Sequence, residues 1–205
     1  LRRTVGPLAA RFVFNSSANS GRPFIIQGHK MILAPEGRYP SPDMVVDRYE
    51  EATTKLFSQL VKPNTVVVDI GANIGYFTLL AAELVGSSGT VYAFEPEPEN
   101  YALLKRNIEL NSYANIQAIE TAVSNESGSI QLYLSAMDNG SHSIYATAAR
   151  GVAATQTVAT TTLDAFLEKE GWPKIDLVKI DVEGAETTVL DGMEQLCERS
   201  PDLNL

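Results

Sequence analysis

A strand that runs directly into a glycine-rich turn and then into a helix constrains this chain more than any other feature. Residues 65–70 (TVVVDI) form a near-continuous β-branched run, which is typical of a strand covered on both faces. A turn over 71–75 (GANIG) follows, and residues 76–85 continue as a predicted helix. Such a strand needs a sheet with helices packed on both sides, so we expect an α/β fold.

The same order of elements continues along the chain. A second strand is predicted over 89–94, and a third over 115–119. The segment between them, 97–111, carries Tyr101, Leu104 and Ile108 at helical spacing. Helical crossovers between consecutive strands imply a mostly parallel, doubly wound sheet with right-handed connections.

This rhythm breaks after the third strand. Short β-prone runs at 128–134, 143–145 and 155–161, with a turn at Asp138-Asn139-Gly140, predict a β-rich insertion. The α/β pattern then resumes with a helix over 162–169 capped by Thr162, a strand over 174–180 and a helix over 185–197. Residues 201–205 resemble the start of a further strand, so we expect the sheet to be truncated at the C-terminal end of this chain.

The N-terminal part is expected to be a separate lead-in over residues 1–48, ahead of a main domain over 49–205. Two β-prone runs around Gln27-Gly28 predict a hairpin with His29 at its tip. Residues 35–42 are expected to be a linker, and residues 47–61 a helix.

Composition narrows the class of partner. Lys and Arg number 16 against 25 Asp and Glu, a formal net charge of -9, which disfavours nucleic acid and anionic membranes. The single cysteine, Cys197, is expected to be a partly buried, inert thiol, and no zinc-type spacing exists, so we predict a reducing compartment and no metal. No apolar run is long enough to span a bilayer, so we expect a cytoplasmic protein. No feature of the sequence specifies an oligomeric state.

The glycine-rich turn limits the ligand. A dinucleotide fingerprint would place glycine at 71, 73 and 76, but Asn73 and Tyr76 occupy the last two positions. Close approach of a pyrophosphate is therefore disfavoured. The acid at the strand tip, Asp69, suits a ligand with a cation near the turn, as in the methionine ammonium and sulfonium of S-adenosylmethionine.

Two further acids follow predicted strands. Glu95 ends the second strand, where a carboxylate can accept both hydroxyls of a ribose, and this fits adenosine and NAD equally. Asp181 ends the strand over 174–180. Because the carboxyl ends of parallel strands meet in one crevice, Asp69, Glu95 and Asp181 are expected to face the same pocket.

Four motifs in this order carry a family resemblance: residues 69–77 (DIGANIGYF), 94–96 (FEP), 162–164 (TLD) and 179–186 (KIDVEGAE). Together they resemble the FkbM family of S-adenosylmethionine-dependent methyltransferases. The resemblance implies a class I methyltransferase (Rossmann-like) fold and O-methylation of a hydroxyl on a sugar, a glycan or a secondary metabolite.

The resemblance also implies roles for individual residues. Glu95 would hold the ribose, and Ala122 and Val123 would lie near the adenine. The residues that would surround the methionine moiety are Asp69, Gly71, Ala72, Asn73 and Gly75. Asp181, which is expected to face the same pocket, is a further candidate for binding the cofactor.

Methyl transfer to a hydroxyl also needs a group that takes the hydroxyl proton. The candidates expected to face the crevice are Asp181, Glu183 and His142. Asp181 is placed best, and His142 has the better ordinary pKa for the task. Asp181 and Glu183 alone do not specify a cation site, so no obligatory metal is predicted.

Two other functions stay open on the sequence alone. One is an RNA base methyltransferase, which the acidic composition and the absence of an Asn-Pro-Pro-aromatic motif disfavour. The other is a non-catalytic nucleotide-binding module in which the β-rich insertion serves a partner.

Overall fold

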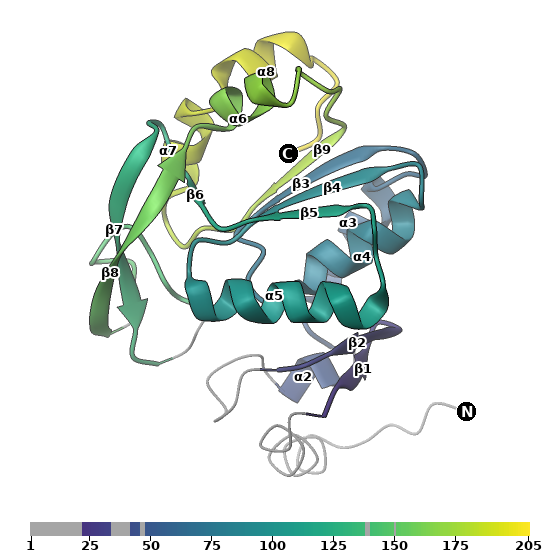
Figure 1. Ribbon diagram of the computed structural model, residues 1–205, viewed down its shortest axis with the longest axis horizontal. Coiled ribbons are helices and arrows are strands. Elements are labelled where there is room, and N and C mark those ends of the chain that lie inside the picture. The colour runs from purple at the N-terminus through teal and green to yellow at the C-terminus, as the bar shows by residue number, and fades with distance from the viewer. Residues whose placement is uncertain (1–21, 34–41, 46–47, 138–139, 150) are drawn as a thin grey trace.

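The computed structural model describes residues 22–33, 42–45, 48–137, 140–149 and 151–205 (Figure 1). Most of the predicted lead-in, nearly all of the predicted linker and residues 138–139 of the predicted turn lie outside the described residues.

The central sheet is parallel, as predicted. Its four strands run in the order β5-β4-β3-β9, and each pairs with its neighbour in parallel. Their bounds are Val66–Ile70 for β3, Thr90–Phe94 for β4, Ile116–Ile119 for β5 and Leu177–Ile180 for β9. Strands β4 and β5 lie on one side of β3, and β9 lies on its other side. The direction of winding therefore reverses between β3 and β9.

Helices cover both faces of this sheet, so two cores form. Helices α3 (Glu51–Leu60), α4 (Tyr76–Val85) and α5 (Pro98–Asn111) lie on one side of it, and α6 (Leu163–Lys169) lies on the other (Figure 1). Neighbouring residues of β3 point to opposite faces: Val67 packs in the core beside α4, and Val68 packs in the core beside α6. This confirms the doubly wound α/β prediction.

The predicted β-rich insertion is a second, three-stranded sheet. Strands β7 (Gly128–Ser135) and β8 (Val152–Thr161) pair antiparallel, and β6 (Ala122–Val123) adds in parallel to β8. The expected strand over 143–145 is wrong: among the described residues this segment shows one isolated bridge, Ser143 to Tyr133. The Ser143 hydroxyl instead donates to the Glu183 carbonyl at 2.7 Å, which ties the segment to the end of β9.

The single helix predicted over 185–197 is also wrong. Two helices, α7 (Glu186–Asp191) and α8 (Glu194–Arg199), replace it. A Cβ on Gly192 would lie 2.1 Å from the Ser124 carbonyl oxygen, so the chain is packed tightly against a neighbour at the break. The Asp164 carboxylate then accepts from the backbone N–H groups of Gln195 and Leu196, both at 2.9 Å, and caps the start of α8.

The TLD motif is therefore a double cap. Thr162 caps α6 as predicted, because its hydroxyl oxygen accepts from the Ala165 N–H at 2.9 Å. Asp164, two residues later, caps α8.

The N-terminal hairpin is confirmed as β1 (Phe24–Ile26) and β2 (His29–Met31). The expected position of His29 at the tip is wrong, because Gln27 and Gly28 form the turn with positive φ and His29 is a buried member of β2. Its Nε2 lies 2.8 Å from the Tyr113 hydroxyl. The short helix α2 (Pro42–Val45) follows the hairpin.

Three smaller expectations are corrected. The helix predicted from residue 47 begins at Glu51, and the strand predicted from residue 174 begins at Leu177. Cys197 is exposed rather than partly buried, because α8 turns that side chain away from the core that Leu196 enters. None of the helices within the described ranges combines the length and the apolar character that a membrane crossing requires.

Candidate active site

The site lies where the sheet changes its direction of winding. A cavity of about 490 Å³ opens there, beyond the carboxyl ends of β3, β4 and β9. Its size is in the ordinary range for a small-molecule site, and ligands of open α/β sheets bind in such a crevice.

The glycine-rich turn forms part of the wall. Gly71 has φ +78, and a Cβ there would lie 1.9 Å from the Asp181 carbonyl oxygen. Only glycine allows the turn after β3 to lie this close to the end of β9. The N–H groups of Gly71 and Ala72 both donate to the Phe94 carbonyl, at 3.0 and 2.9 Å, which fixes the turn against β4.

The second glycine of the turn has a different task. Gly75 has φ +99 and is the N-cap residue of α4. A Cβ there would lie 2.8 Å from Cδ1 of Leu104 on α5, so a side chain at this position would require the end of the Leu104 side chain to shift, in addition to the strain of the positive φ.

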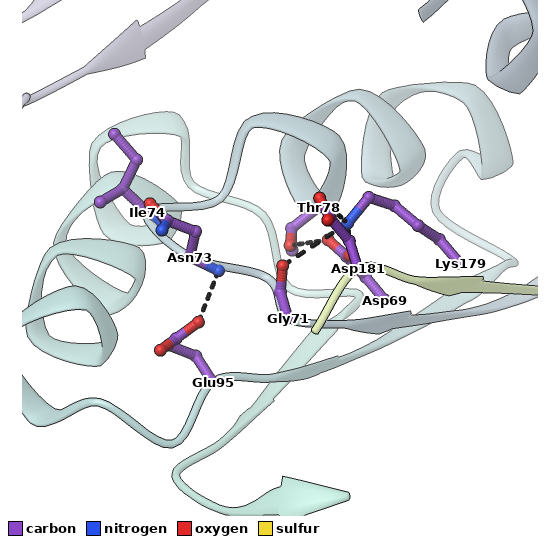
Figure 2. Close-up of polar contacts among 8 residues, drawn as sticks. All are labelled: Asp69, Gly71, Asn73, Ile74, Thr78, Glu95, Lys179 and Asp181. Carbon is purple, nitrogen blue, oxygen red and sulfur yellow. Dashed lines mark hydrogen bonds and ion pairs between the residues drawn. The ribbon is translucent and has the colours of Figure 1, made fainter. Parts of the chain in front are cut away.

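Glu95 is buried at the end of β4, with 5% of its surface exposed. One carboxylate oxygen accepts from the backbone N–H group of Asn73 at 2.7 Å (Figure 2), and the other accepts from that of Glu97 at 3.0 Å. Burial raises the pKa of Glu95 to about 7, although both backbone hydrogen bonds oppose that rise. A side-chain hydrogen bond with Asn100 also opposes the rise of the Glu95 pKa.

A charged cluster occupies the other end of the turn. Asp69, which is fully buried, accepts from Lys179 Nζ at 3.1 Å on one oxygen and from the Thr78 hydroxyl at 2.6 Å on the other (Figure 2). Lys179 Nζ also lies 3.5 Å from Asp181. Burial alone lowers the pKa of Lys179, but the two aspartates outweigh it and raise that pKa above its usual value.

The segment after Gly140 closes another side of the cavity. His142 lines the cavity, and its Nδ1 accepts from the Ser135 N–H at 2.9 Å. A neutral imidazole with Nδ1 as acceptor carries its proton on Nε2. Glu183, which also lines the cavity, has a left-handed backbone with φ 49.

The structure brings together all but two of the predicted site residues. Asp69 and Gly75 are absent from the lining, because Asp69 is enclosed by Lys179 and Thr78 and Gly75 is enclosed by Leu104. The predicted residues that line the cavity are Gly71, Ala72, Asn73, Glu95, Ala122, Val123, His142, Asp181 and Glu183.

Sequence reasoning missed two charged residues of the lining, Glu50 and Lys179. Burial, followed by repulsion from Asp181, raises the pKa of Glu50. Glu50 lies near no motif, so no signal pointed to it. Lys179 did carry one, because a cation between Val178 and Ile180 of a buried strand needs an acidic partner.

A metal centre is not evident in this part of the molecule. Within the described ranges, no three or more His, Cys, Asp or Glu side chains gather closely enough to hold an ion.

Comparison with known proteins gives one family and several relatives. The model of the methyltransferase FkbM domain matches residues 69–203. Methyltransferase 1 of Beauveria bassiana is 31% identical over 148 residues, covering 64% of this chain and 59% of the relative. The hexuronic acid methyltransferase AglP of Haloferax volcanii is 29% identical over 147 residues, covering 71% of this chain and 57% of the relative. The chain thus spans somewhat less than two thirds of the length of these relatives.

Among solved structures, a precorrin-6y C5,15-methyltransferase from Geobacter metallireducens GS-15 matches with a TM-score of 0.45 and 14% identity. The match covers 74% of this chain and 58% of that one.

Proposed function

The chain belongs to the FkbM family of methyltransferases, and we propose that it transfers a methyl group from S-adenosylmethionine to a hydroxyl group of a sugar, a glycan or a secondary metabolite. The observation that carries this proposal is the one cavity around which the glycine-rich turn, buried Glu95 and Asp181 meet. The name of the relative AglP, a hexuronic acid methyltransferase, supports a sugar acceptor. We further propose that residues 49–205 form the cofactor-binding domain and that residues 1–48 precede it.

The groups around the cavity suit the cofactor. A ribose diol needs hydrogen-bond acceptors, and Glu95 offers two carboxylate oxygens. An adenine ring needs an apolar surface, and Ala122, Val123 and Leu132 supply one. The ammonium of the methionine moiety needs an acidic partner, and Asp181, which lines the cavity, supplies one.

When bound, S-adenosylmethionine supplies an electrophilic methyl group on a sulfonium centre. The chain has to hold the acceptor hydroxyl in line with that carbon and take up the hydroxyl proton. Asp181 lies 3.5 Å from the Lys179 ammonium, and we assign this pair to the cofactor rather than to the acceptor proton. His142 carries its proton on Nε2 when neutral, so it is suited to donate a hydrogen bond. We therefore assign the proton to the Glu183 carboxylate.

The charge of the cavity favours one kind of acceptor. Among its described lining residues, four carboxylates accompany the single lysine: Glu50, Glu95, Asp181 and Glu183. Glu95 and Asp181 are assigned to the cofactor, so Glu50 and Glu183 are the acids that we propose to face the acceptor. Their negative charge disfavours an anionic sugar such as a hexuronic acid relative to a neutral hydroxyl compound.

Calorimetric titration with S-adenosylhomocysteine tests the cofactor site without knowledge of the acceptor. NAD serves as the parallel control. We expect saturable binding of S-adenosylhomocysteine alone, and binding of NAD alone would refute the proposal. A panel of neutral hexosides and matched hexuronic acids, incubated with methyl-labelled S-adenosylmethionine, then tests the acceptor class.

Two conservative variants separate the roles of the acids. Glu183→Gln is expected to lower the rate of methyl transfer at least tenfold while the affinity for S-adenosylhomocysteine stays unchanged. Asp181→Asn is expected to weaken that affinity. Equal rates for Glu183→Gln and the wild type would remove Glu183 as the base.

A further inference from the structure

Lys179 is the residue of the cavity whose presence the proposed function does not by itself explain. It lies on β9 directly opposite Asp69 of β3, because these two residues are register partners in the parallel pair. Its side chain is 12% exposed, and it lines the cavity. Its ammonium lies 5.1 Å from the centre of the Phe77 ring, which shields one side of it from water.

The contacts of the ammonium leave it room for another partner. An ammonium has three N–H donors, and among its contacts with described residues only the one to Asp69, at 3.1 Å, has the length of a good hydrogen bond. The other two contacts, to the Asp181 carboxylate and the Gly71 carbonyl, are each 3.5 Å long. The Asp181 side chain is 49% exposed and so is free to adjust, whereas Asp69 is enclosed.

The arrangement of charges matches the amino-acid end of the proposed cofactor. An α-amino acid carries a carboxylate and an ammonium on one carbon atom. Lys179 and Asp181 present the two opposite charges beside Gly71. Their charged atoms lie 3.5 Å apart, so they are close enough to face both groups of one amino acid. Figure 2 shows this cluster on one side of Gly71 and Glu95 with Asn73 on the other, so both ends of the ligand would have a partner.

We propose that Lys179 is a cofactor-binding residue that receives the carboxylate of the methionine moiety, and that Asp69 is a positioning residue that holds the lysine in place. This inference rests on the proposed function. The resemblance placed Asp69 against the cofactor. Here Asp69 acts through Lys179, since its own oxygens are taken by Lys179 and Thr78.

The test compares two ligands that differ only at the amino-acid end. S-Adenosylhomocysteine carries the carboxylate, whereas 5′-methylthioadenosine keeps the adenosine and the thioether and lacks the amino-acid group. For Lys179→Met we expect at least a tenfold loss of affinity for S-adenosylhomocysteine and less than a twofold change for 5′-methylthioadenosine. The control, Lys174→Met, removes the same charge from a side chain that is 81% exposed, and should leave both affinities unchanged.

Removal of Lys179 alone leaves buried Asp69 unpaired and can unfold the chain. The double variant Asp69→Asn/Lys179→Met avoids that charge and is expected to show the same selective loss, with folding checked by thermal unfolding. An equal loss for both ligands, or no loss for S-adenosylhomocysteine, overturns the role of Lys179. A wild-type chain that binds neither ligand overturns the proposed function and this inference with it.

Discussion

Substitution of Glu95 by glutamine tests the site most directly, because the structure predicts two measurable effects: the pH dependence of cofactor binding disappears, and the binding itself weakens. The pKa of Glu95 rises from 4.5 to about 7, chiefly through burial. If the ribose diol binds the ionised carboxylate, the affinity of the wild type for S-adenosylhomocysteine should be roughly tenfold weaker at pH 6 than at pH 8, because one pH unit below the pKa leaves about a tenth of the sites ionised.

Glutamine should remove this pH dependence and weaken the binding itself. At pH 8 we expect Glu95→Gln to lower the affinity by about tenfold or more, since a hydrogen bond to a charged group contributes ~1.5 to 3 kcal/mol. Calorimetric titration at pH 6, 7 and 8 measures both effects. The same pH profile in the wild type and in Glu95→Gln would refute the assignment of the ribose to Glu95.

The same substitution has a second readout that needs no ligand. Because the pKa of Glu95 is higher in the folded chain than in the unfolded one, the folded state is favoured when the group is protonated. The free energy of unfolding should therefore fall by about 3 kcal/mol as the pH rises from below 4.5 to above 7. In Glu95→Gln this decline should be smaller by that amount, as measured by urea unfolding across the range. Its amide would also face one of the two backbone donors, at a cost of about 1 to 3 kcal/mol.

Three further predictions concern the frame of the site. Gly71→Ala should destabilise the chain by about 3 kcal/mol or more in urea unfolding. Gly28 has a similar φ of +86 but open space around it, so Gly28→Ala should cost only about 1 kcal/mol. Equal costs would contradict the role of close packing at Gly71. Asn107→Leu should lower the free energy of unfolding by roughly 2 to 4 kcal/mol, because the buried amide forms hydrogen bonds with both backbone groups of Ile32 and with the Ile74 carbonyl. Asn111→Leu should lower it less, because that exposed amide forms hydrogen bonds with Lys30. The reverse order would be inconsistent with this account. Chelation with EDTA should leave methyl transfer unchanged, and a loss of activity that magnesium restores would show that a metal is required.

Asn107 and Asn111 show what sequence patterns do not reveal about the frame. Their side-chain amides, one helical turn apart on α5, each exchange a pair of hydrogen bonds with the backbone of the segment around β2. Asn107 donates in addition to the Ile74 carbonyl of the glycine-rich turn at 2.8 Å. The helix therefore joins the N-terminal hairpin to the cavity wall. Two asparagines in a helix give no such indication, since the same spacing is common on solvated helix faces.

The sequence by itself determined the order of the central strands, the helices between them and the positions of the acids. Local periodicity carries that information: residues 66–68 are apolar in succession because the strand is covered on both faces, and Glu95 and Asp181 follow strands of the same kind. Parallel pairing then places both acids at one edge of the sheet, and both line the cavity.

Only the tertiary structure decided what each charged group contacts. Asp69 and Asp181 both lie at strand ends, yet Asp69 is enclosed and Asp181 is half exposed, because the register of β3 against β9 sets Lys179 opposite Asp69. The pKa of Glu95 likewise depends on how much of the chain covers it. Asp69 and Lys179 are 110 positions apart, and their pairing depends on how two distant strands align. The burial of Glu95 likewise depends on elements from other parts of the chain, so no local pattern in the sequence records either property.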